Sequence, residues 1–222
     1  FTYTYTEQGK IASMTEEGVG TTSYTYDSTG CNLTGVTDAR GNTTNYTYDD
    51  YGNILSETDP CGNTTSYTYD AANRKISETD ALGAQTKITY DWYGNVKSKT
   101  DALGNVTQYQ YNTAGQLTEV IYADGGKECY TYDALGNCRS ITNRAGLTTE
   151  FNYDVYGNQT EVLYPNGTRQ SYVYDIYGRV TESTDIYGNK TDYSYDSSDR
   201  LVQLTTAEGK NYVTAYDRGT SN

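Results

Sequence analysis

Polar and apolar residues alternate along this chain in short runs, and Gly interrupts the pattern about every ten residues. In the stretch Thr44-Asn45-Tyr46-Thr47-Tyr48, the alternation places Thr44, Tyr46 and Tyr48 on one side of a strand and the other two residues on the opposite side. β-Branched and aromatic residues dominate such runs, as they do in strands. No segment keeps a 3.6-residue period, so helices are not expected. The pattern predicts an all-β chain of short strands.

Most predicted strands end in a turn that follows the consensus Asp-x-x-Gly-Asn. Residues 49–53 form one such turn, residues 54–58 a second strand, and residues 59–63 a second turn of the same chemistry. Asp accepts hydrogen bonds from amides ahead of it, and Gly supplies positive φ. Asn73 and Asp199 replace Gly in two turns, and both residue types tolerate the left-handed conformation. The expected turn glycines are Gly30, Gly41, Gly52, Gly62, Gly83, Gly94, Gly104, Gly115, Gly125, Gly136, Gly146, Gly157, Gly167, Gly178, Gly188 and Gly209.

A Tyr-Asp pair recurs at a fixed period through the chain. The interval is 21 residues except between Tyr26 and Tyr48, where it is 22. A fixed period of this length predicts a repeat array. We expect the extra residue, between Gly30 and Asp38, to form a β-bulge. The structural dyads are Tyr26-Asp27, Tyr48-Asp49, Tyr69-Asp70, Tyr90-Asp91, Tyr111-Asn112, Tyr132-Asp133, Tyr153-Asp154, Tyr174-Asp175, Tyr195-Asp196 and Tyr216-Asp217.

The two turns of each repeat alternate, so they should lie on opposite rims of one antiparallel ribbon. About ten repeats of two strands give roughly 20 strands, or about 95 Å of ribbon at about 4.8 Å per strand. Closed in one turn, such a ribbon would be too wide for side chains to fill. We therefore predict one long, curved antiparallel sheet of 21-residue hairpin repeats, as a spiral or as a segment of a hollow shell or barrel. Residues 1–222 are interpreted as a single array, a fragment of a larger protein, because they start and stop in mid-repeat.

The composition indicates that tyrosine supplies much of the apolar surface available for packing. Only 35% of the residues are hydrophobic, below the usual share of about 45–50%, whereas 27 are Tyr. We expect Tyr46, Tyr67, Tyr130, Tyr172 and Tyr193 to form cross-strand aromatic ladders. The alternative is that exposed rings stack on sugars beside Asn and Asp. The apolar residues inside many turns are expected to fold over the sheet ends or to pack on neighbouring turns.

Charge excludes two classes of partner. The net charge of −13 disfavours nucleic acid, which needs basic surfaces, and anionic lipid. No run of 18 apolar residues exists, so membrane insertion is not expected.

Cys31, Cys61, Cys129 and Cys138 show no metal-binding spacing and are expected to be free thiols.

No residue pattern predicts an enzyme. His is absent, which removes the commonest general base and metal ligand. The aspartates occupy positions that turns require, so we assign no catalytic, cofactor-binding or metal-binding residue. A carboxylate pair contributed by different repeats, as in glycosidases, and calcium bound by acidic turns remain alternatives.

The unit Tyr-x-Tyr-Asp-x-x-Gly-Asn, followed by Thr-Asp-x-x-Gly-Asn-x-Thr, resembles the YD repeat of the Rhs family. The resemblance extends from Tyr3-Thr4-Tyr5 to Tyr216-Asp217. The family includes bacterial Rhs and wall-associated polymorphic toxins, C subunits of insecticidal toxin complexes, and teneurins. The resemblance implies a strand-by-strand spiral that builds a hollow β-shell. In the toxins such a shell encloses an effector, and in teneurins it belongs to an adhesion receptor.

The resemblance leads us to expect a structural, encapsulating shell segment of a secreted or surface bacterial protein that encloses or presents a toxin or effector domain. The alternative is an extracellular adhesion or carbohydrate-binding module. Rhs toxins close their shell with a Pro- and Asp-containing self-cleavage segment, whereas Pro60 and Pro165 lie in ordinary turns here. Expected partners are protein cargo or neighbouring repeats, with glycans as an alternative. Open sheet edges predict self-association.

Overall fold

The computed structural model describes residues 1–214 and consists of β-strands joined by turns. The last predicted dyad, Tyr216-Asp217, lies outside the described residues. Residues 1–214 contain no helix that is long and apolar enough to cross a membrane. Because the described elements are all strands, the all-β prediction is confirmed. The chain divides into two compact units, one ending at Gln108 and the other beginning at Tyr109.

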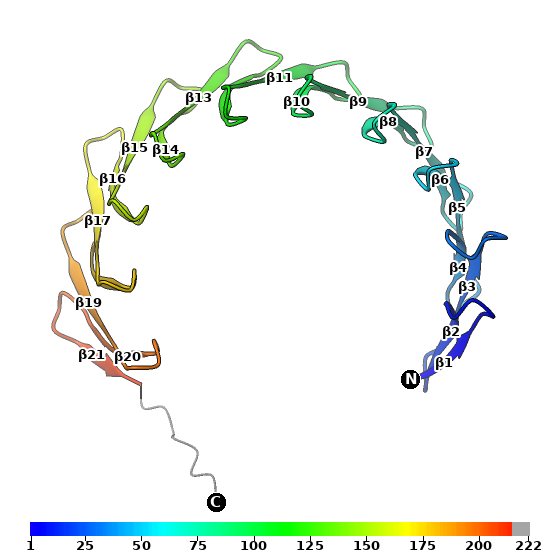
Figure 1. Cartoon of the computed structure of the whole chain (residues 1–222), viewed down its shortest axis with the longest axis horizontal. Helices are drawn as coiled ribbons and strands as arrows, with labels where there is room; N and C mark the ends of the chain where they lie inside the picture. The colour runs from blue at the N-terminus through cyan, green and yellow to red at the C-terminus, as the bar shows by residue number, and fades with distance from the viewer. Residues whose placement is uncertain (215–222) are drawn as a thin grey trace, which may run out of the picture. The chain divides into compact units, whose positions relative to one another are not determined.

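In the first unit, each strand pairs antiparallel with its neighbours in sequence (Figure 1). β11 (Val106–Tyr111) contains the boundary between the units, and its first three residues pair with β10. The other strands are β1 (Thr2–Tyr5), β2 (Ile11–Glu16), β3 (Gly20–Tyr26), β4 (Leu33–Thr37), β5 (Thr43–Tyr48), β6 (Ile54–Thr58), β7 (Thr64–Tyr69), β8 (Lys75–Thr79), β9 (Gln85–Tyr90) and β10 (Val96–Thr100).

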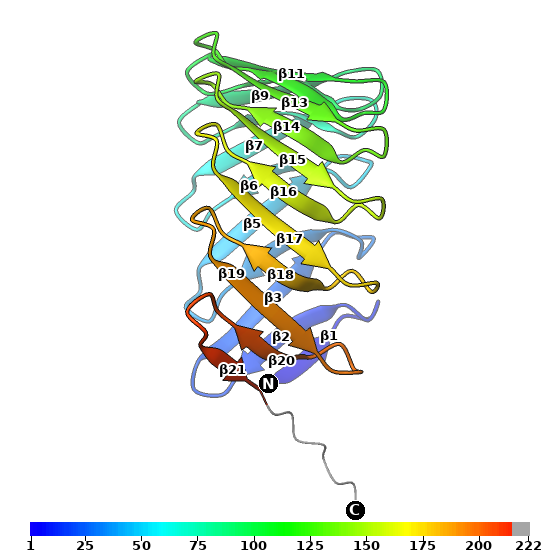
Figure 2. The ribbon, with the colours of Figure 1, turned by 90° about the vertical axis from the view of Figure 1, so that its left-hand side faces the viewer.

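The second unit follows the same rule, and its turns alternate between two opposite rims (Figure 2). In both units, turns that follow a Tyr-Asp pair form the first rim, and the other turns form the second rim. The strands are β12 (Leu117–Ile121), β13 (Lys127–Tyr132), β14 (Cys138–Thr142), β15 (Thr148–Tyr153), β16 (Gln159–Leu163), β17 (Arg169–Tyr174), β18 (Val180–Thr184), β19 (Lys190–Tyr195), β20 (Leu201–Thr205) and β21 (Asn211–Val213).

The register differs between the two kinds of strand pair. Strands β5 and β6, joined at the first rim, pair from Asn45–Thr58 to Tyr48–Ile54, with a bulge that leaves Leu55 unpaired. Strands β6 and β7, joined at the second rim, pair at only three positions, from Thr58–Thr64 to Ser56–Ser66. The second ladder therefore stops before it reaches the first rim, and backbone groups there need other partners.

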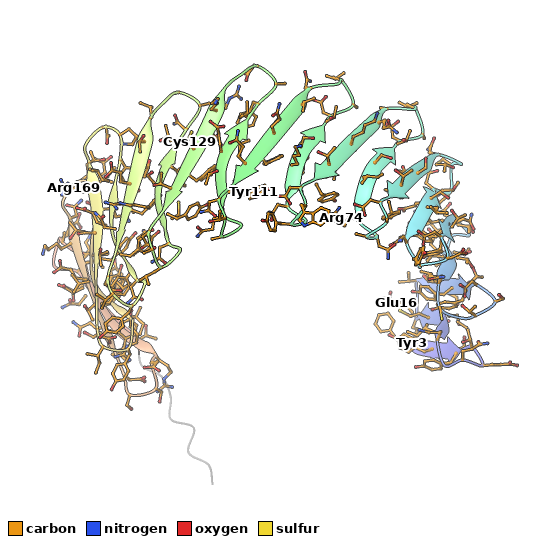
Figure 3. All side chains as sticks on the ribbon, turned by 45° about the horizontal axis from the view of Figure 1, so that its top comes forward. Tyr3, Glu16, Arg74, Tyr111, Cys129 and Arg169 are labelled. Carbon is orange, nitrogen blue, oxygen red and sulfur yellow. The ribbon has the colours of Figure 1, made fainter. Side chains whose placement is uncertain are left out.

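This register gives the ribbon two chemically different faces. The tyrosine face carries both tyrosines of each Tyr-x-Tyr segment, and Figure 3 shows Tyr3 and Glu16 on this face of the first unit. The opposite hydroxyl face carries cross-strand Ser/Thr pairs, such as Thr47 and Ser56, whose oxygens are 2.6 Å apart. Equivalent pairs at 2.6 Å join Thr68 to Ser77, Thr89 to Ser98 and Thr131 to Ser140.

Within residues 1–214, neither face of the sheet is covered by a second layer. Val120 and Val162, each 6% exposed, are the buried hydrophobic residues of the described chain. The accessible surface is 15084 Å², about half as large again as the roughly 10,000 Å² of a compact monomer of this mass. Stability must therefore come mainly from strand ladders and contacts between adjacent repeats.

Three expectations from the sequence are wrong. The extra residue does not form a strand bulge: it widens the turn, so that the Asp27 amide donates to the Asn32 carbonyl five residues ahead, at 2.9 Å. The aromatic ladders are absent from the paired strands, because Tyr46 lies opposite Glu57 and Tyr67 opposite Glu78. A 21-residue period spans two strands, so equivalent tyrosines are never direct neighbours.

The third wrong expectation concerns the apolar turn residues. They project into solvent instead of packing over the sheet, and Trp92 is 97% exposed. Each lies at one of the two central positions of a turn closed by its own backbone and Asp hydrogen bonds, so its side chain points away from the ribbon. The strongly exposed turn residues include Tyr51, Leu82, Tyr93, Leu103, Leu135, Val155, Tyr156, Ile176, Tyr177 and Tyr187.

Candidate functional site

The tyrosine of each Tyr-Asp pair from Tyr26 to Tyr195 joins adjacent hairpins. The Tyr69 hydroxyl donates a hydrogen bond of 2.9 Å to the Ile54 carbonyl, 15 residues earlier, at the start of β6. This carbonyl lies where the β6–β7 ladder has already stopped. The phenol thus supplies a donor that the backbone does not. The same contact links Tyr26 to Ile11, Tyr48 to Leu33, Tyr90 to Lys75, Tyr132 to Leu117, Tyr153 to Cys138, Tyr174 to Gln159 and Tyr195 to Val180.

The aspartate of the pair closes the first-rim turn. Asp154 Oδ1 accepts the amides of Tyr156 and Asn158, both at 2.9 Å, and its Oδ2 accepts Asn158 Nδ2 at 2.9 Å. We call this arrangement the Asp–Asn clamp. Second-rim turns with Asp and Asn have it as well, at Asp38, Asp59, Asp101 and Asp185. Asn112 makes the corresponding contacts with Gln116.

Glycine completes each clamped turn. The Gly157 amide donates to the Asp154 carbonyl at 3.1 Å, and the Asp154 amide donates to the Asn158 carbonyl at 2.9 Å. All the turn glycines that the sequence predicts have positive φ, between 72° and 93°. Asn73 and Asp199 have φ of 60°, so both adopt the left-handed conformation.

These contacts shift the pKa values of the Asp and Tyr side chains that make them. The hydrogen bond from the Asn53 side chain, together with backbone amides, lowers the pKa of Asp49. The Asn158 side chain does the same for the pKa of Asp154. On the tyrosine face, burial and the hydrogen bond to Glu128 raise the pKa of Tyr130 to about 12. Asp49 and Asp154 therefore stay charged and Tyr130 stays neutral across the physiological range, which suits structural contacts and not proton transfer.

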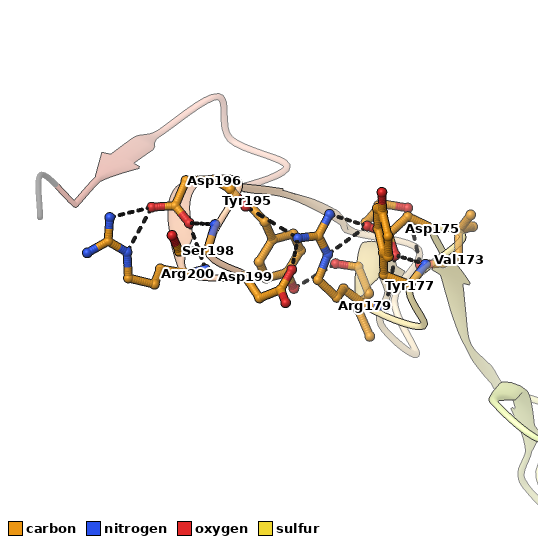
Figure 4. Close-up of polar contacts among 11 residues, drawn as sticks. Val173, Asp175, Tyr177, Arg179, Tyr195, Asp196, Ser198, Asp199 and Arg200 are labelled. Atoms are coloured by element: carbon orange, nitrogen blue, oxygen red, sulfur yellow. Dashed lines mark hydrogen bonds and ion pairs between the residues drawn. The ribbon is translucent and has the colours of Figure 1, made fainter.

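Arginine replaces the clamp asparagine at Arg74, Arg179 and Arg200, and at Arg74 and Arg179 it also contacts the next repeat. Arg179 Nε lies 2.8 Å from Asp175 Oδ2, and its Nη1 lies 2.6 Å from Asp199 Oδ1 in the following turn (Figure 4). Its guanidinium carbon is 4.7 Å from the centre of the Tyr195 ring. Because Arg combines ion pairing with ring stacking, it links successive turns along the first rim.

The sequence analysis did not identify the hydrogen-bond partners of the Tyr hydroxyls. These partners are main-chain carbonyls, which every residue has, so no residue type in the sequence marks them. By contrast, Ser recurs nine residues after Thr at Thr47 and Ser56 and at Thr68 and Ser77, a regularity that could have indicated the hydroxyl pairs.

The other polar side chains of the described residues form no recognisable reaction centre. In residues 1–214, no three His, Cys, Asp or Glu side chains lie close enough to hold a metal ion. All four cysteines are free thiols, as the sequence predicts. The Asp–Asn clamp uses its carboxylates within their own turns, so the arrangement stabilises those turns.

One kind of recess recurs between adjacent first-rim turns. In the first unit it has a volume of about 450 Å³, and its lining includes Tyr51, Leu55 and Thr68. In the second unit it has a volume of about 390 Å³, and its lining includes Tyr156 and Thr160. These linings occupy equivalent positions in repeats that are five apart, so the recess is a product of the repeat.

Comparison with known proteins supports the same interpretation. The chain matches the RHS Repeat family at residues 26–63, 48–85, 90–127, 132–169, 153–190 and 174–210. No curated protein sequence matches it. A crystal structure of TcdB2-TccC3 has a similar fold over 93% of this chain, with a TM-score of 0.70 and 15% sequence identity. A Tc holotoxin pore from Photorhabdus luminescens covers 89% of it, with a TM-score of 0.56 and 16% identity.

The chain spans only a small part of these relatives, 12% of the first and 15% of the second. At such identities the likeness shows the fold alone. The repeated family matches, however, together cover well over half of the residues. The 21-residue unit of Tyr ties and Asp–Asn clamps is therefore an RHS repeat, and this chain belongs to the RHS repeat family.

Proposed function

We propose that this chain is a wall segment of an Rhs-type shell that encloses or presents a polypeptide cargo in a secreted or surface bacterial protein. The observation that supports this most directly is the Tyr tie. It joins each hairpin to the previous one by a contact that any number of repeats can propagate. A sheet built in this way grows along one dimension without a core, which is the property a wall requires.

The chemistry of the site agrees with a structural role. The clamp carboxylates are occupied by their own turns, and the phenols by neighbouring carbonyls. The relatives of similar fold are described as TcdB2-TccC3 assemblies and as a Tc holotoxin pore, and we extend the shell role from that group to this chain. Any toxic or proteolytic activity then belongs to other parts of such a protein.

The proposal is tested by limited proteolysis of a full-length polypeptide that contains this segment. We expect the cargo region to resist protease in the wild type and to become cleavable when Tyr132, Tyr153 and Tyr174 are all changed to Phe. A triple variant at the exposed Tyr51, Tyr93 and Tyr156 is the control and should keep the protection. A cargo region that is cleaved equally fast in all three proteins would refute the containment role. So would hydrolytic turnover by the purified segment that is lost on changing a single Asp.

A second candidate function is glycan binding. The recurrent first-rim recess, with an exposed Tyr at its edge in each unit, favours it, because aromatic rings are suited to stacking on sugars. A glycan array would test it. Binding that disappears in Tyr51→Ser and Tyr156→Ser, but not in Tyr187→Ser on the other rim, would favour this function over containment.

A further inference from the structure

Two consecutive repeats of the first unit carry a carboxylate on the tyrosine face, directly opposite a tyrosine. Strand pairing places Glu57 opposite Tyr46. One repeat later it places Glu78 opposite Tyr67. By contrast, Tyr24 at the equivalent position faces an uncharged side chain. A half-buried phenol ring beside a carboxylate is suited to an ammonium group, because the ring face and the carboxylate both attract positive charge. We call each such pair a Tyr–Glu box.

The second Tyr–Glu box is filled by the chain itself. Lys75 Nζ lies 2.7 Å from Glu78 Oε2 and 5.2 Å from the centre of the Tyr67 ring. The hydrogen bond to Glu78 raises the pKa of Lys75, so its ammonium group is charged throughout the physiological range. This repeat therefore shows which group fits such a box: a primary ammonium at the end of a flexible four-carbon stem.

The first Tyr–Glu box has the same ring and carboxylate but lacks the cation. Ile54 occupies the position that Lys75 has one repeat later. Within residues 1–214, Glu57 makes no hydrogen bond and no ion pair. Burial raises the pKa of Tyr67, and the negative charges of Glu78 and Glu57 add to this effect, so Glu57 also acts on the ring of the next repeat. The first box is thus an unfilled copy of the second.

We propose that the box of Tyr46 and Glu57 binds the ammonium group of a lysine side chain presented by a second polypeptide. Lys75 supplies the precedent for the occupant, and the net charge of −13 favours the approach of a cationic partner. Exposed ion pairs and cation–π contacts are each weak, so one box orients a polypeptide that further contacts retain. Salt should weaken the binding by screening. The proposal does not depend on the shell function or on a cargo.

The primary test is an NMR titration with a lysine peptide, acetyl-Gly-Lys-Gly-amide, at constant ionic strength. We expect the ring resonances of Tyr46 to shift saturably with this peptide and to stay in place with the same peptide acetylated on its lysine, which has no charge. Glu57→Gln should weaken the binding at least about threefold, because the ion pair is lost. The matched control is Asp50→Asn, which removes an equal charge from an exposed turn residue and should leave the binding unchanged.

Two further variants exchange the states of the boxes. Ile54→Lys should place a lysine of the chain itself in the first box and abolish the shifts at Tyr46. Lys75→Ile should empty the second box and add saturable shifts at Tyr67. Each substitution copies a residue that a neighbouring repeat already carries at the equivalent position, so both variants should fold.

Several outcomes would overturn the proposal. The wild type could show no saturable shift at Tyr46, or the acetylated peptide could bind as well as the charged one. Asp50→Asn could weaken the binding as much as Glu57→Gln does, which would make net charge alone responsible. Ile54→Lys could still bind the peptide, or Lys75→Ile could gain no site. Tighter binding of butylammonium than of the lysine peptide would overturn the assignment to a polypeptide and identify a free amine instead.

Discussion

The Tyr174 hydroxyl donates a hydrogen bond of 2.7 Å to the main-chain carbonyl of Gln159, the first residue of β16. Strands β16 and β17 pair only from Leu163–Arg169 to Glu161–Ser171, so this carbonyl has no partner in that ladder. A side chain thereby closes the gap that the register leaves at the first rim.

Removing this hydroxyl should destabilise the second unit. We expect Tyr174→Phe to lower the free energy of unfolding by about 1–2 kcal/mol, because the half-buried carbonyl loses its donor. Urea titration followed by circular dichroism measures the change. Tyr156→Phe, at an exposed turn position, is the matched control and should have little effect. Equal shifts for the two variants would contradict the role of the tie.

Two adjacent aspartates offer a test of the clamp. Asp49 Oδ1 accepts the amides of Tyr51 and Asn53 at 2.9 Å each, whereas Asp50 is exposed and has no hydrogen bond in the described structure. We expect Asp49→Ala to lower the free energy of unfolding by about 1–2 kcal/mol, as the loss of other Asx caps does. Asp50→Ala should be neutral. Thermal melts of both variants check this, and an equal loss in Asp50→Ala would show that charge alone is responsible.

Stability should fall at both ends of the pH scale. The pKa of Asp49 is lowered in the folded state, chiefly by the Asn53 side chain, so its stabilisation is complete above about pH 4 and is lost as the pH falls through the folded pKa. The pKa of Tyr130 is raised to about 12, mainly by burial, so its stabilisation is complete below about pH 10 and is lost as the pH rises towards that value. The urea midpoint of unfolding should be constant between about pH 4 and pH 10 and should fall on both sides of this range. A midpoint that stays constant below pH 4 would contradict this.

The two non-glycine residues at positive φ should respond differently to glycine. Asn73→Gly relieves the left-handed strain at the cost of one exposed hydrogen bond of 3.1 Å from Asn53, so we expect a gain of up to about 1 kcal/mol. Asp199→Gly also removes the ion pair with Arg179, and the two effects should nearly cancel. Chemical denaturation in low and high salt separates them, because only the second variant loses a salt-sensitive contact. A destabilised Asn73→Gly would show that the strain is negligible.

The exposed turn residues illustrate where sequence reasoning failed. Trp92 and Leu135 look like packing residues by composition, but their turns close on themselves and leave no partner for these side chains. The expected aromatic ladders failed for a related reason, since the pairing of Tyr46 with Glu57 depends on register and not on composition.

Local chemistry was determined by the sequence alone. Alternation defined the strands, Asp and Gly defined the turns, and Asn73 and Asp199 were assigned the left-handed conformation that they have, because these preferences act within a few residues. The tertiary structure decided which groups meet across strands. The tie from Tyr174 to Gln159 and the bridge from Arg179 to Asp199 both depend on pairing register. Register is a property of neighbouring strands together, and no single 21-residue unit contains it.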